Sequence, residues 1–230
     1  MAQPRVILLA LARVDTVLWV GGAQWAGKTT VARLLAARYP LVVYAYDYHD
    51  ARSHSARARA DADRFPAYNA LLAALDDDPD RVWSDPSPEQ MAERELAVFS
   101  ERFQMVLEDL SALAEATPVL AEGWGLRPDL VAPHLAAPEQ AIFLVPTRSF
   151  RQSQLDALDR AKRLRVSGLQ EPTRAQRNRV ERDLLLSDDV VARASALGLP
   201  VLEVDGTEDA PAVAERVERQ FRPFLPTWLY

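Results

Sequence analysis

The chain has 230 residues, enough for a full hydrophobic core, and a formal net charge of −6. Hydrophobic residues make up 49% of it and charged residues 26%, as in globular proteins that fold in water. The negative charge makes the whole molecule a poor non-specific binder of nucleic acid. Because the chain has no cysteine, disulfides and cysteine metal sites are excluded, which fits a cytoplasmic protein.

The apolar segment 6–12 follows Arg5 and resembles the hydrophobic part of a signal peptide. Arg13 and Asp15 come directly after it, and no small-residue cleavage site precedes the next strand. We therefore expect an additional strand or helix there, or an overlong gene start. No apolar run approaches the length of a membrane span, so no membrane partner is expected.

Predicted strands and helices alternate along most of the chain. The strands are expected at 16–20, 41–46, 119–121, 141–145 and 199–204, and the helices at 30–39, 65–75, 88–116 and 210–224. This alternation predicts an α/β fold, with a parallel sheet covered by helices on both faces. We expect one domain over residues 1–230, in which 51–116 forms a helical insertion that binds an acceptor.

Residues 22–29 read Gly-Ala-Gln-Trp-Ala-Gly-Lys-Thr and fit the phosphate-loop pattern G-x-x-x-x-G-K-[ST] at every fixed position. The glycines let backbone amides turn inward around an anion, and the following helix adds its positive end. Lys28 is expected to reach the β- and γ-phosphates, and the Thr29 hydroxyl to bind Mg²⁺. The structural alternative is an ordinary glycine turn. The predicted nucleotide-binding residues are Gly22, Ala23, Gln24, Trp25, Ala26, Gly27, Lys28, Thr29 and Thr30.

Two features of composition support this motif. Lys28 is one of only two lysines among 27 basic residues, and a compact charge on a flexible stem suits a phosphate. Six of the 8 glycines lie in the loop or just after predicted strands, where ligands bind in such sheets. Gly206 follows the fifth strand, and we expect it where the nucleotide base rests.

Acidic residues follow two further strands. Glu122 ends the third strand and is expected to hold the water shell of Mg²⁺, unless it is only a loop cap. Asp47 ends the second strand and is expected to orient the acceptor hydroxyl and to accept its proton, with Asp50 as the second candidate. His49 and His54 lie nearby, but no helical or hairpin spacing presents them together as metal ligands.

The segment 148–182 is basic within an acidic chain, with ten lysines and arginines against four acids. Many such charge runs are solvated helix faces. This one follows the fourth strand, where arginines of a mobile lid can fold over the phosphates and exclude water. A helix that starts near Pro172 places Arg174 and Arg177 on one face, and we predict these two as catalytic, with Arg179 as the alternative.

With these residues the chain resembles the P-loop small-molecule kinases, which include nucleoside monophosphate kinases, gluconate kinase and chloramphenicol phosphotransferase. The resemblance covers nearly the whole chain, and the phosphate loop is its specific part. It implies a three-layer P-loop NTPase sandwich with a five-stranded parallel sheet of order 2-3-1-4-5, and ATP and Mg²⁺ as cofactors. The Gly-[Phe/Tyr]-Pro-Arg stretch of adenylate-kinase-like members is replaced by Glu122-Gly-Trp-Gly-Leu-Arg-Pro128, which disfavours a nucleoside monophosphate acceptor.

The sequence therefore favours transfer of the γ-phosphoryl group of Mg·ATP to a small-molecule acceptor. The alternative is a nucleotide-dependent switch or regulatory ATPase, in which the 51–116 region changes shape for a protein partner. A kinase of nucleic-acid 5′ ends is disfavoured by the net charge, although the basic 148–182 segment leaves room for one. The sequence indicates neither the acceptor nor the oligomeric state.

Overall fold

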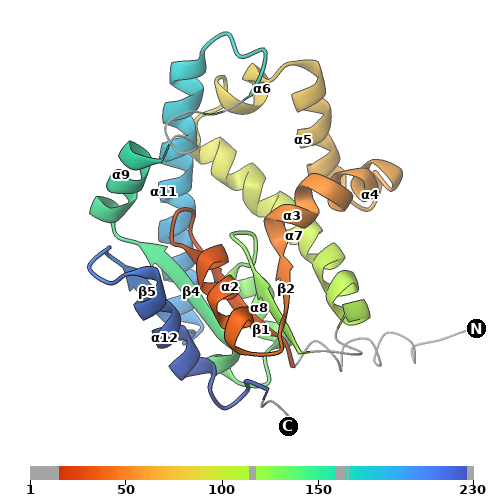
Figure 1. Cartoon of the computed structure of the whole chain (residues 1–230). Coiled ribbons are helices and arrows are strands. Elements are labelled where there is room, and N and C mark those ends of the chain that lie inside the picture. Colours follow the sequence, from red (N-terminus) through yellow and green to blue (C-terminus); the bar gives the residue numbers. More distant parts are fainter. Residues whose placement is uncertain (1–15, 114–117, 159–163, 165, 227–230) are drawn as a thin grey trace, which may run out of the picture.

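A computed structural model describes residues 16–113, 118–158, 164 and 166–226 (Figure 1). Five strands form one parallel sheet in the order β2-β3-β1-β4-β5, which confirms the predicted order. The second strand is shorter than expected, because the backbone turns into a helix at Tyr46. The strands are β1 (Leu18–Gly22), β2 (Val42–Ala45), β3 (Val119–Glu122), β4 (Ala141–Pro146) and β5 (Val201–Val204).

Helices connect these strands. The predicted start of the longest one is confirmed, because the Ser87 amide donates to Gln90 Oε1 at 2.9 Å and the Gln90 amide donates to Ser87 Oγ at 3.3 Å. The helices are α2 (Lys28–Arg38), α3 (Tyr46–His49), α4 (Ser55–Ala60), α5 (Pro66–Asp77), α6 (Asp80–Trp83), α7 (Pro88–Leu113), α8 (Pro128–Val131), α9 (Arg148–Ala157), α11 (Pro172–Ala196) and α12 (Ala210–Phe221), with a π-helical turn η2 (Asp50–His54) and 3-10 turns η3 (Ala132–His134) and η4 (Pro138–Gln140).

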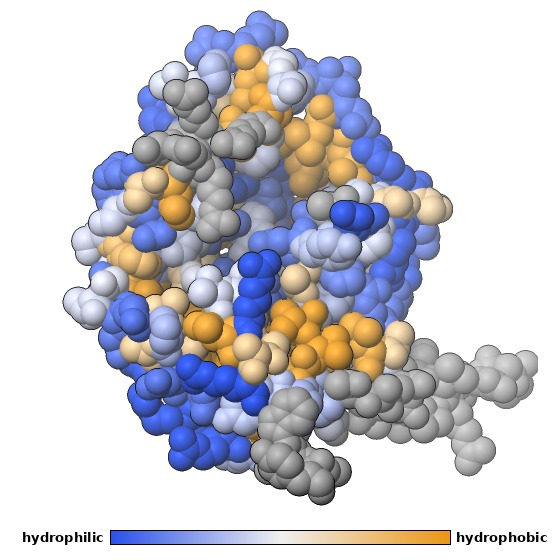
Figure 2. Space-filling model, in the orientation of Figure 1, coloured by the Kyte–Doolittle hydropathy of each residue, from blue (hydrophilic) through white to orange (hydrophobic). Residues whose placement is uncertain are grey.

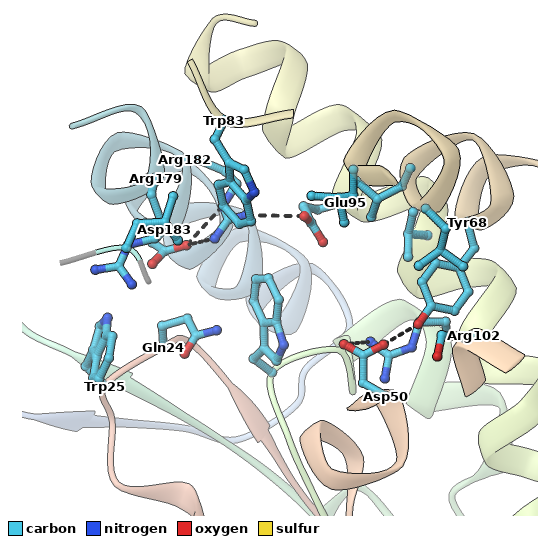
Figure 3. Close-up of a pocket in the computed structure, with 17 residues that line it drawn as sticks. Gln24, Trp25, Asp50, Tyr68, Trp83, Glu95, Arg102, Arg179, Arg182 and Asp183 are labelled. Atoms are coloured by element: carbon cyan, nitrogen blue, oxygen red, sulfur yellow. Dashed lines mark hydrogen bonds and ion pairs between the residues drawn. The ribbon is translucent and has the colours of Figure 1, made fainter. Parts of the chain in front are cut away.

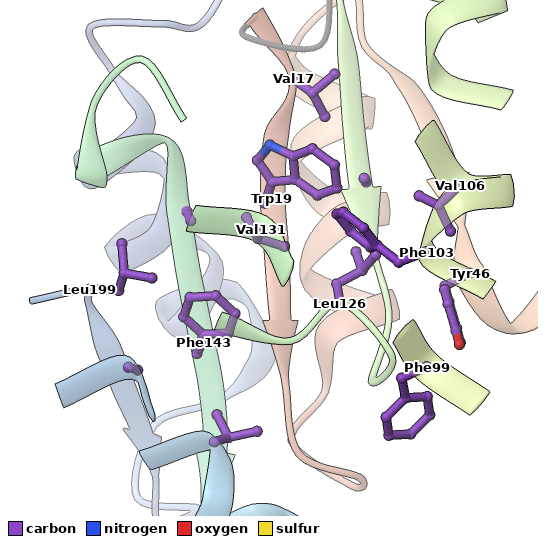
Figure 4. Packing of buried hydrophobic residues seen from close by; sticks show 14 of the residues in the cluster. Val17, Trp19, Tyr46, Phe99, Phe103, Val106, Leu126, Val131, Phe143 and Leu199 are labelled. Carbon is purple, nitrogen blue, oxygen red and sulfur yellow. The ribbon is translucent and has the colours of Figure 1, made fainter. Parts of the chain in front are cut away.

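Apolar side chains bury both faces of the sheet. On one face Trp19 of β1 packs against α7 and α8, with its ring 5.9 Å from that of Phe103 and with Val131 in the same cluster (Figure 4). On the other face Val31 of α2 and Val217 of α12 belong to a second buried cluster. The sheet is therefore the middle of three layers, as expected for a parallel sheet whose strands read as continuous apolar runs.

A helical insertion stands above the carboxyl ends of the strands (Figure 1). It comprises η2, α4, α5, α6 and the first half of α7, and it has its own apolar cluster, which includes Phe65, Leu72 and Val98. The insertion predicted at 51–116 is thus helical as far as Leu113; residues 114–117 lie outside the described part of the chain. Because α7 continues from the insertion onto the sheet, one rigid helix joins the two regions.

None of the helices that the structure describes is both long enough and apolar enough to cross a bilayer.

Candidate functional site

The phosphate-loop residues form a tight turn between β1 and α2. Trp25 and Gly27 both have left-handed backbone conformations, with φ of 65° and 81°. A left-handed conformation costs a residue with a Cβ about 1–2 kcal/mol, and such strain clusters at functional sites. Alternating right- and left-handed residues turn successive amides into one concavity, which suits an anion. The first turn of α2 contains no acidic residue and its N-cap is Gly27, so neither a first-turn acid nor a capping side chain offsets the positive end of this helix.

Lys28 lies inside this loop. Its Nζ donates to the carbonyl oxygen of Ala23 at 2.6 Å, and the residue is buried. Burial lowers the pKa of Lys28, while the charges of Asp47 and Glu122 act in the opposite direction. The loop therefore holds the Lys28 amine on one of its own carbonyl oxygens, which a phosphate oxygen could replace.

Thr29 and Glu122 lie in contact at the start of α2 and the end of β3. Thr29 Oγ1 is 3.0 and 3.1 Å from the two carboxylate oxygens of Glu122, to which it donates. Burial raises the pKa of Glu122, Lys28 lowers it, and Asp47 raises it further. Two neighbouring oxygen ligands of an octahedral Mg²⁺ lie about 3.0 Å apart when each Mg–O bond is about 2.1 Å long. The oxygens of Thr29 and Glu122 have this spacing. These hard oxygen donors thus fit a small divalent cation.

Asp47 occupies the first turn of α3, directly after β2. Its side chain is open to the space above the loop, but protein surrounds the carboxylate on its other sides. Burial therefore raises the pKa of Asp47; Lys28 and Arg102 oppose this rise, and Asp50 adds to it. A carboxylate with a raised pKa in a cleft is typical of a group that accepts a proton during catalysis.

Trp25 lines three pockets, which adjoin one another at this residue. The loop pocket, of about 380 Å³, is lined by Gln24, Lys28, Thr29, Arg33 and Asp47 among others. The side pocket, of about 220 Å³, lies between the start of α2 and the elements β5, α9 and α12. The insertion pocket, of about 520 Å³, lies under the insertion. In Figure 2 a hollow separates the insertion, at the top, from the sheet below.

The insertion pocket has an apolar wall from α5 and α7, to which Leu71, Leu72 and Val98 contribute. Arginine–carboxylate clusters occupy two of its edges (Figure 3). At one edge Arg102 Nη1 lies 3.3 Å from Asp50 Oδ2, and Tyr68 also donates to Asp50. At the other edge, α11 and α7 meet through a further arginine and two acids, namely Arg182 with Glu95 at 3.2 Å and Asp183 at 2.7 Å.

Sequence reasoning missed the charged residues of α7 that line this pocket. Glu95 and Arg102 are buried at positions that continue the inward face of the helix between Met91, Val98 and Met105. A charged residue on the apolar face of a predicted helix indicates a buried partner of opposite charge, because isolated charges are rarely buried. The partners themselves, Asp50 and Arg182, come from other elements, so the signal alone could not have identified the pocket.

The predicted catalytic arginines lie apart from the loop. Arg174 and Arg177 are exposed and line a shallow hollow with Ser87 and Gln90, not the loop pocket. The reason is the orientation of α11. Asn178 contributes to it, because its amide donates to the carbonyl oxygens of Trp83, Ser84 and Pro86 at 3.4, 3.1 and 3.0 Å. The alternative, Arg179, faces the site, with its guanidinium 5.9 Å from the centre of the Trp25 ring.

The predicted lid segment 148–182 does not coincide with one structural unit. Its first part is α9, its last part is the first half of the 25-residue helix α11, and residues 159–163 and 165 lie outside the described chain. On α9 the structure places a further cation, Arg151, which is buried and whose charge helps to lower the pKa of Lys28. Its Nε and Nη2 have no hydrogen-bond partner among the described residues. Sequence analysis did not single out Arg151.

Gly206 lies at the edge of the side pocket. It has a φ of 85°, and a Cβ there would lie 2.5 Å from the ring of Phe150, which lines this pocket. Gly206 therefore lets the turn after β5 close against Phe150. The walls of the side pocket come from this ring and from apolar residues of α2, β5 and α12, such as Val31, Val204 and Val213.

His49 and His54 come together, contrary to the sequence expectation. The π-helical turn Asp50–His54 places residues five apart on one side, and both histidines approach Asp109 of α7, with nitrogen–oxygen distances of 3.8 and 3.0 Å. Arg57 also pairs with Asp109 at 2.7 Å. A cation already on this carboxylate disfavours a metal ion, so the cluster is best explained as an anchor of the insertion on α7.

A scan of the chain against protein-family models gave no match, and a search among curated proteins found no significant similarity. Fold and site together define an α/β protein with a phosphate-loop motif after the first strand of a five-stranded parallel sheet.

Proposed function

We propose that this protein is a P-loop kinase that transfers the γ-phosphoryl group of Mg·ATP to a small-molecule acceptor. The observation that carries the proposal is the meeting of three pockets at Trp25. The loop pocket would hold the triphosphate, the side pocket the base, and the insertion pocket the acceptor. In this arrangement the γ-phosphate would lie between Lys28 and the opening of the insertion pocket, as an in-line transfer requires.

The loop amides and Lys28 would bind the phosphates, with Lys28 exchanging its hydrogen bond to Ala23 for one to a phosphate oxygen. Thr29 and Glu122 would hold Mg²⁺, directly or through its water shell, and this ion would neutralise charge on the β- and γ-phosphates. Arg179 and Arg151 would add positive charge beside the transferred group. The distance of 5.9 Å between the Arg179 guanidinium and the Trp25 ring supports Arg179 in the role that was predicted for Arg174 and Arg177.

Asp47 would accept the proton of the acceptor hydroxyl. It lines the loop pocket together with Gln24 and Trp25, and these two residues also line the insertion pocket, so an acceptor bound there would approach Asp47 past Gln24 and Trp25. The pKa of Asp47 is raised by burial and moderated by Lys28, which suits a base that must be ionised near neutral pH and still take up a proton.

The side pocket has the size and lining expected for the nucleotide base. Its volume of about 220 Å³ fits one heterocycle, and its walls are mostly apolar. We propose ATP as the nucleotide and a cytoplasmic location, where ATP is abundant. A small-molecule acceptor is preferred over nucleic acid because the chain is acidic overall.

The decisive experiment is a search for the phosphorylated product. The protein is incubated with Mg·ATP and a fractionated cell extract, and ³¹P NMR and mass spectrometry are used to detect a new phosphoester together with ADP. Asp47→Asn should abolish this product while calorimetry still detects ATP binding. ATP binding or hydrolysis without any phosphorylated small molecule would instead support the regulatory ATPase.

A further inference from the structure

We propose that the insertion pocket selects an uncharged acceptor that carries an apolar ring system and a hydroxyl group, and that it rejects carboxylated and phosphorylated molecules. This inference rests on the proposed function, because it names the class of acceptor for the same site. It follows from the charge balance and the lining of the pocket.

Of the three basic side chains that the structure describes in this pocket, Arg102 and Arg182 form ion pairs with carboxylates. The three arginines Arg102, Arg179 and Arg182 share the pocket with the three acids Asp50, Glu95 and Asp183. Arg102 pairs with Asp50 and also donates to the backbone carbonyl of Tyr46 at 3.3 Å. No excess positive charge is left at these positions for an anionic acceptor.

Arg182 is also fixed in place by its surroundings. Its side chain is 4% exposed, and its guanidinium lies 5.3 Å from the centre of the Trp83 ring and 5.3 Å from that of Trp124. It binds Glu95 and Asp183 in addition. To turn toward a substrate carboxylate, Arg182 would have to break its ion pairs with Glu95 and Asp183 and leave both acids buried without it. Breaking a buried ion pair is strongly unfavourable. An anionic acceptor would also lie close to these acids.

Arg179 is assigned to the phosphate end of the pocket. It lies above Trp25, where the insertion pocket meets the loop pocket, and its pKa is lowered by burial, with the charge of Asp183 acting in the opposite direction. A cation at this position serves the transferred phosphoryl group better than a distant part of the acceptor. The deep part of the pocket is left without an available cation among the described residues.

The deep part of the pocket suits an apolar ring. Leu71, Leu72, Leu75 and Val98 form its wall, and the ring of Tyr68 borders them. The volume of about 520 Å³ matches a molecule larger than a simple sugar. Asp50 is a partly accessible polar group here, with 41% of its side chain exposed, and it can accept a hydrogen bond from a hydroxyl or amide of the acceptor.

The test compares two probes with the same ring and different charge. Binding of 2-naphthaleneethanol and of 2-naphthaleneacetate to the full chain is measured by ligand-observed NMR and tryptophan fluorescence. We expect the alcohol to bind with a Kd of about 1 mM or tighter, and the carboxylate at least about tenfold more weakly. Equal or tighter binding of the carboxylate, or no binding of the alcohol, would overturn the inference.

One variant tests directly whether the charge of Asp50 excludes an anionic ligand. Asp50→Asn removes the acid that opposes Arg102, so it should improve carboxylate binding about tenfold without improving alcohol binding. Asp85→Asn is the matched control, because Asp85 is exposed, lies outside the insertion pocket and has the same charge. If the Asp50 variant does not fold, the comparison of the two probes on the unaltered chain still tests whether the pocket prefers the uncharged ligand.

The same experiment separates this inference from the proposed function. Calorimetry with Mg·ATP is run on the same preparation. ATP binding together with a preference for the carboxylate would overturn the inference and leave the kinase proposal intact. Alcohol binding without any ATP binding would overturn the kinase proposal and leave the insertion pocket as a site for neutral ligands.

Discussion

The hydroxyl of Thr29 donates to both carboxylate oxygens of Glu122, at 3.0 and 3.1 Å, and so joins the first turn of α2 to the end of β3. The two residues are 93 positions apart in the sequence. They meet because β1 and β3 are adjacent parallel strands, with Val20 opposite Glu122, so that their carboxyl ends lie at one edge of the sheet. This contact is the structural basis of the proposed Mg²⁺ site.

Glu122→Gln should weaken nucleotide binding only when Mg²⁺ is present. The amide is nearly isosteric but lacks the charge that a divalent cation requires. Calorimetry is done with ATP in Mg²⁺ and again in EDTA; we expect a loss of about tenfold or more in Mg²⁺ and little change in EDTA. Thr29→Ser keeps the oxygen and serves as the control. An equal loss in both buffers would show that Glu122 acts on the fold and not on a cation.

Lys28→Ala should reduce affinity for Mg·ATP by about 100-fold, because one charge-assisted hydrogen bond contributes about 1.5–3 kcal/mol. Arg33→Ala is the control. Arg33 lines the same pocket, and its substitution removes the same charge. Because Arg33 is exposed, we expect the affinity for Mg·ATP to fall by only a few-fold. Similar losses for the two variants, measured by calorimetry, would argue against a specific role for Lys28.

Asp47→Asn should abolish turnover and leave ATP affinity within a few-fold of the original protein. In the unaltered protein the rate should fall as pH is lowered through the raised pKa of Asp47, because only the ionised carboxylate accepts a proton. The measurement is a pH profile of kcat/KM. A rate that is flat across the acidic limb, or a variant that retains turnover, would assign the base elsewhere, with Asp50 next in line.

The same variant should be more stable than the original protein at neutral pH. The folded-state pKa of Asp47 lies above its unfolded value, so ionised Asp47 opposes folding at high pH and this penalty disappears below the unfolded pKa, near 4. Thermal unfolding should show a higher Tm for Asp47→Asn at pH 7, and a difference that shrinks toward pH 4. A lower Tm at pH 7 would mean that Asp47 stabilises the fold through Lys28.

Asp109→Ala should loosen the insertion and destabilise the protein by about 2 kcal/mol, because the hydroxyl of Tyr44 and the buried ring of His54 both lose their hydrogen bond to this carboxylate and keep only the 3.3 Å contact with each other. Burial would raise the pKa of Asp109, but hydrogen bonds from His54 and Tyr44 and the charge of Arg57 lower it overall. Its contribution to stability is therefore present above the unfolded pKa and is lost as pH falls through the folded one.

Glu108→Ala is the matched control for this prediction. Glu108 is the neighbouring acid on α7 and pairs with Arg57 and Arg64 at the surface, where its side chain is 46% exposed. Exposed pairs contribute at most about 1 kcal/mol, so denaturant unfolding should show a much smaller change than for Asp109→Ala. Equal effects would contradict the assignment of Asp109 as the anchor of the insertion.

Local sequence features were enough to predict much of the fold. The start of α7 at Ser87 and Pro88 follows from capping chemistry within four residues, and the loop from Gly22 to Thr29 is one contiguous motif. The strands follow from short apolar runs, although β2 ends at Ala45 because α3 begins there. These features were predictable because each one depends on residues that are neighbours in the chain.

The composition of the insertion pocket was decided by tertiary structure alone. Arg182 and Glu95 are 87 residues apart, and only the packing of α11 against α7 brings them together. The same packing turns Arg179 toward Trp25 and leaves Arg174 and Arg177 in solvent. A helical pattern predicts which residues share a face, but the direction of that face depends on contacts such as those of Asn178 with the carbonyl oxygens after α6, and such long-range contacts have no signature in the local sequence.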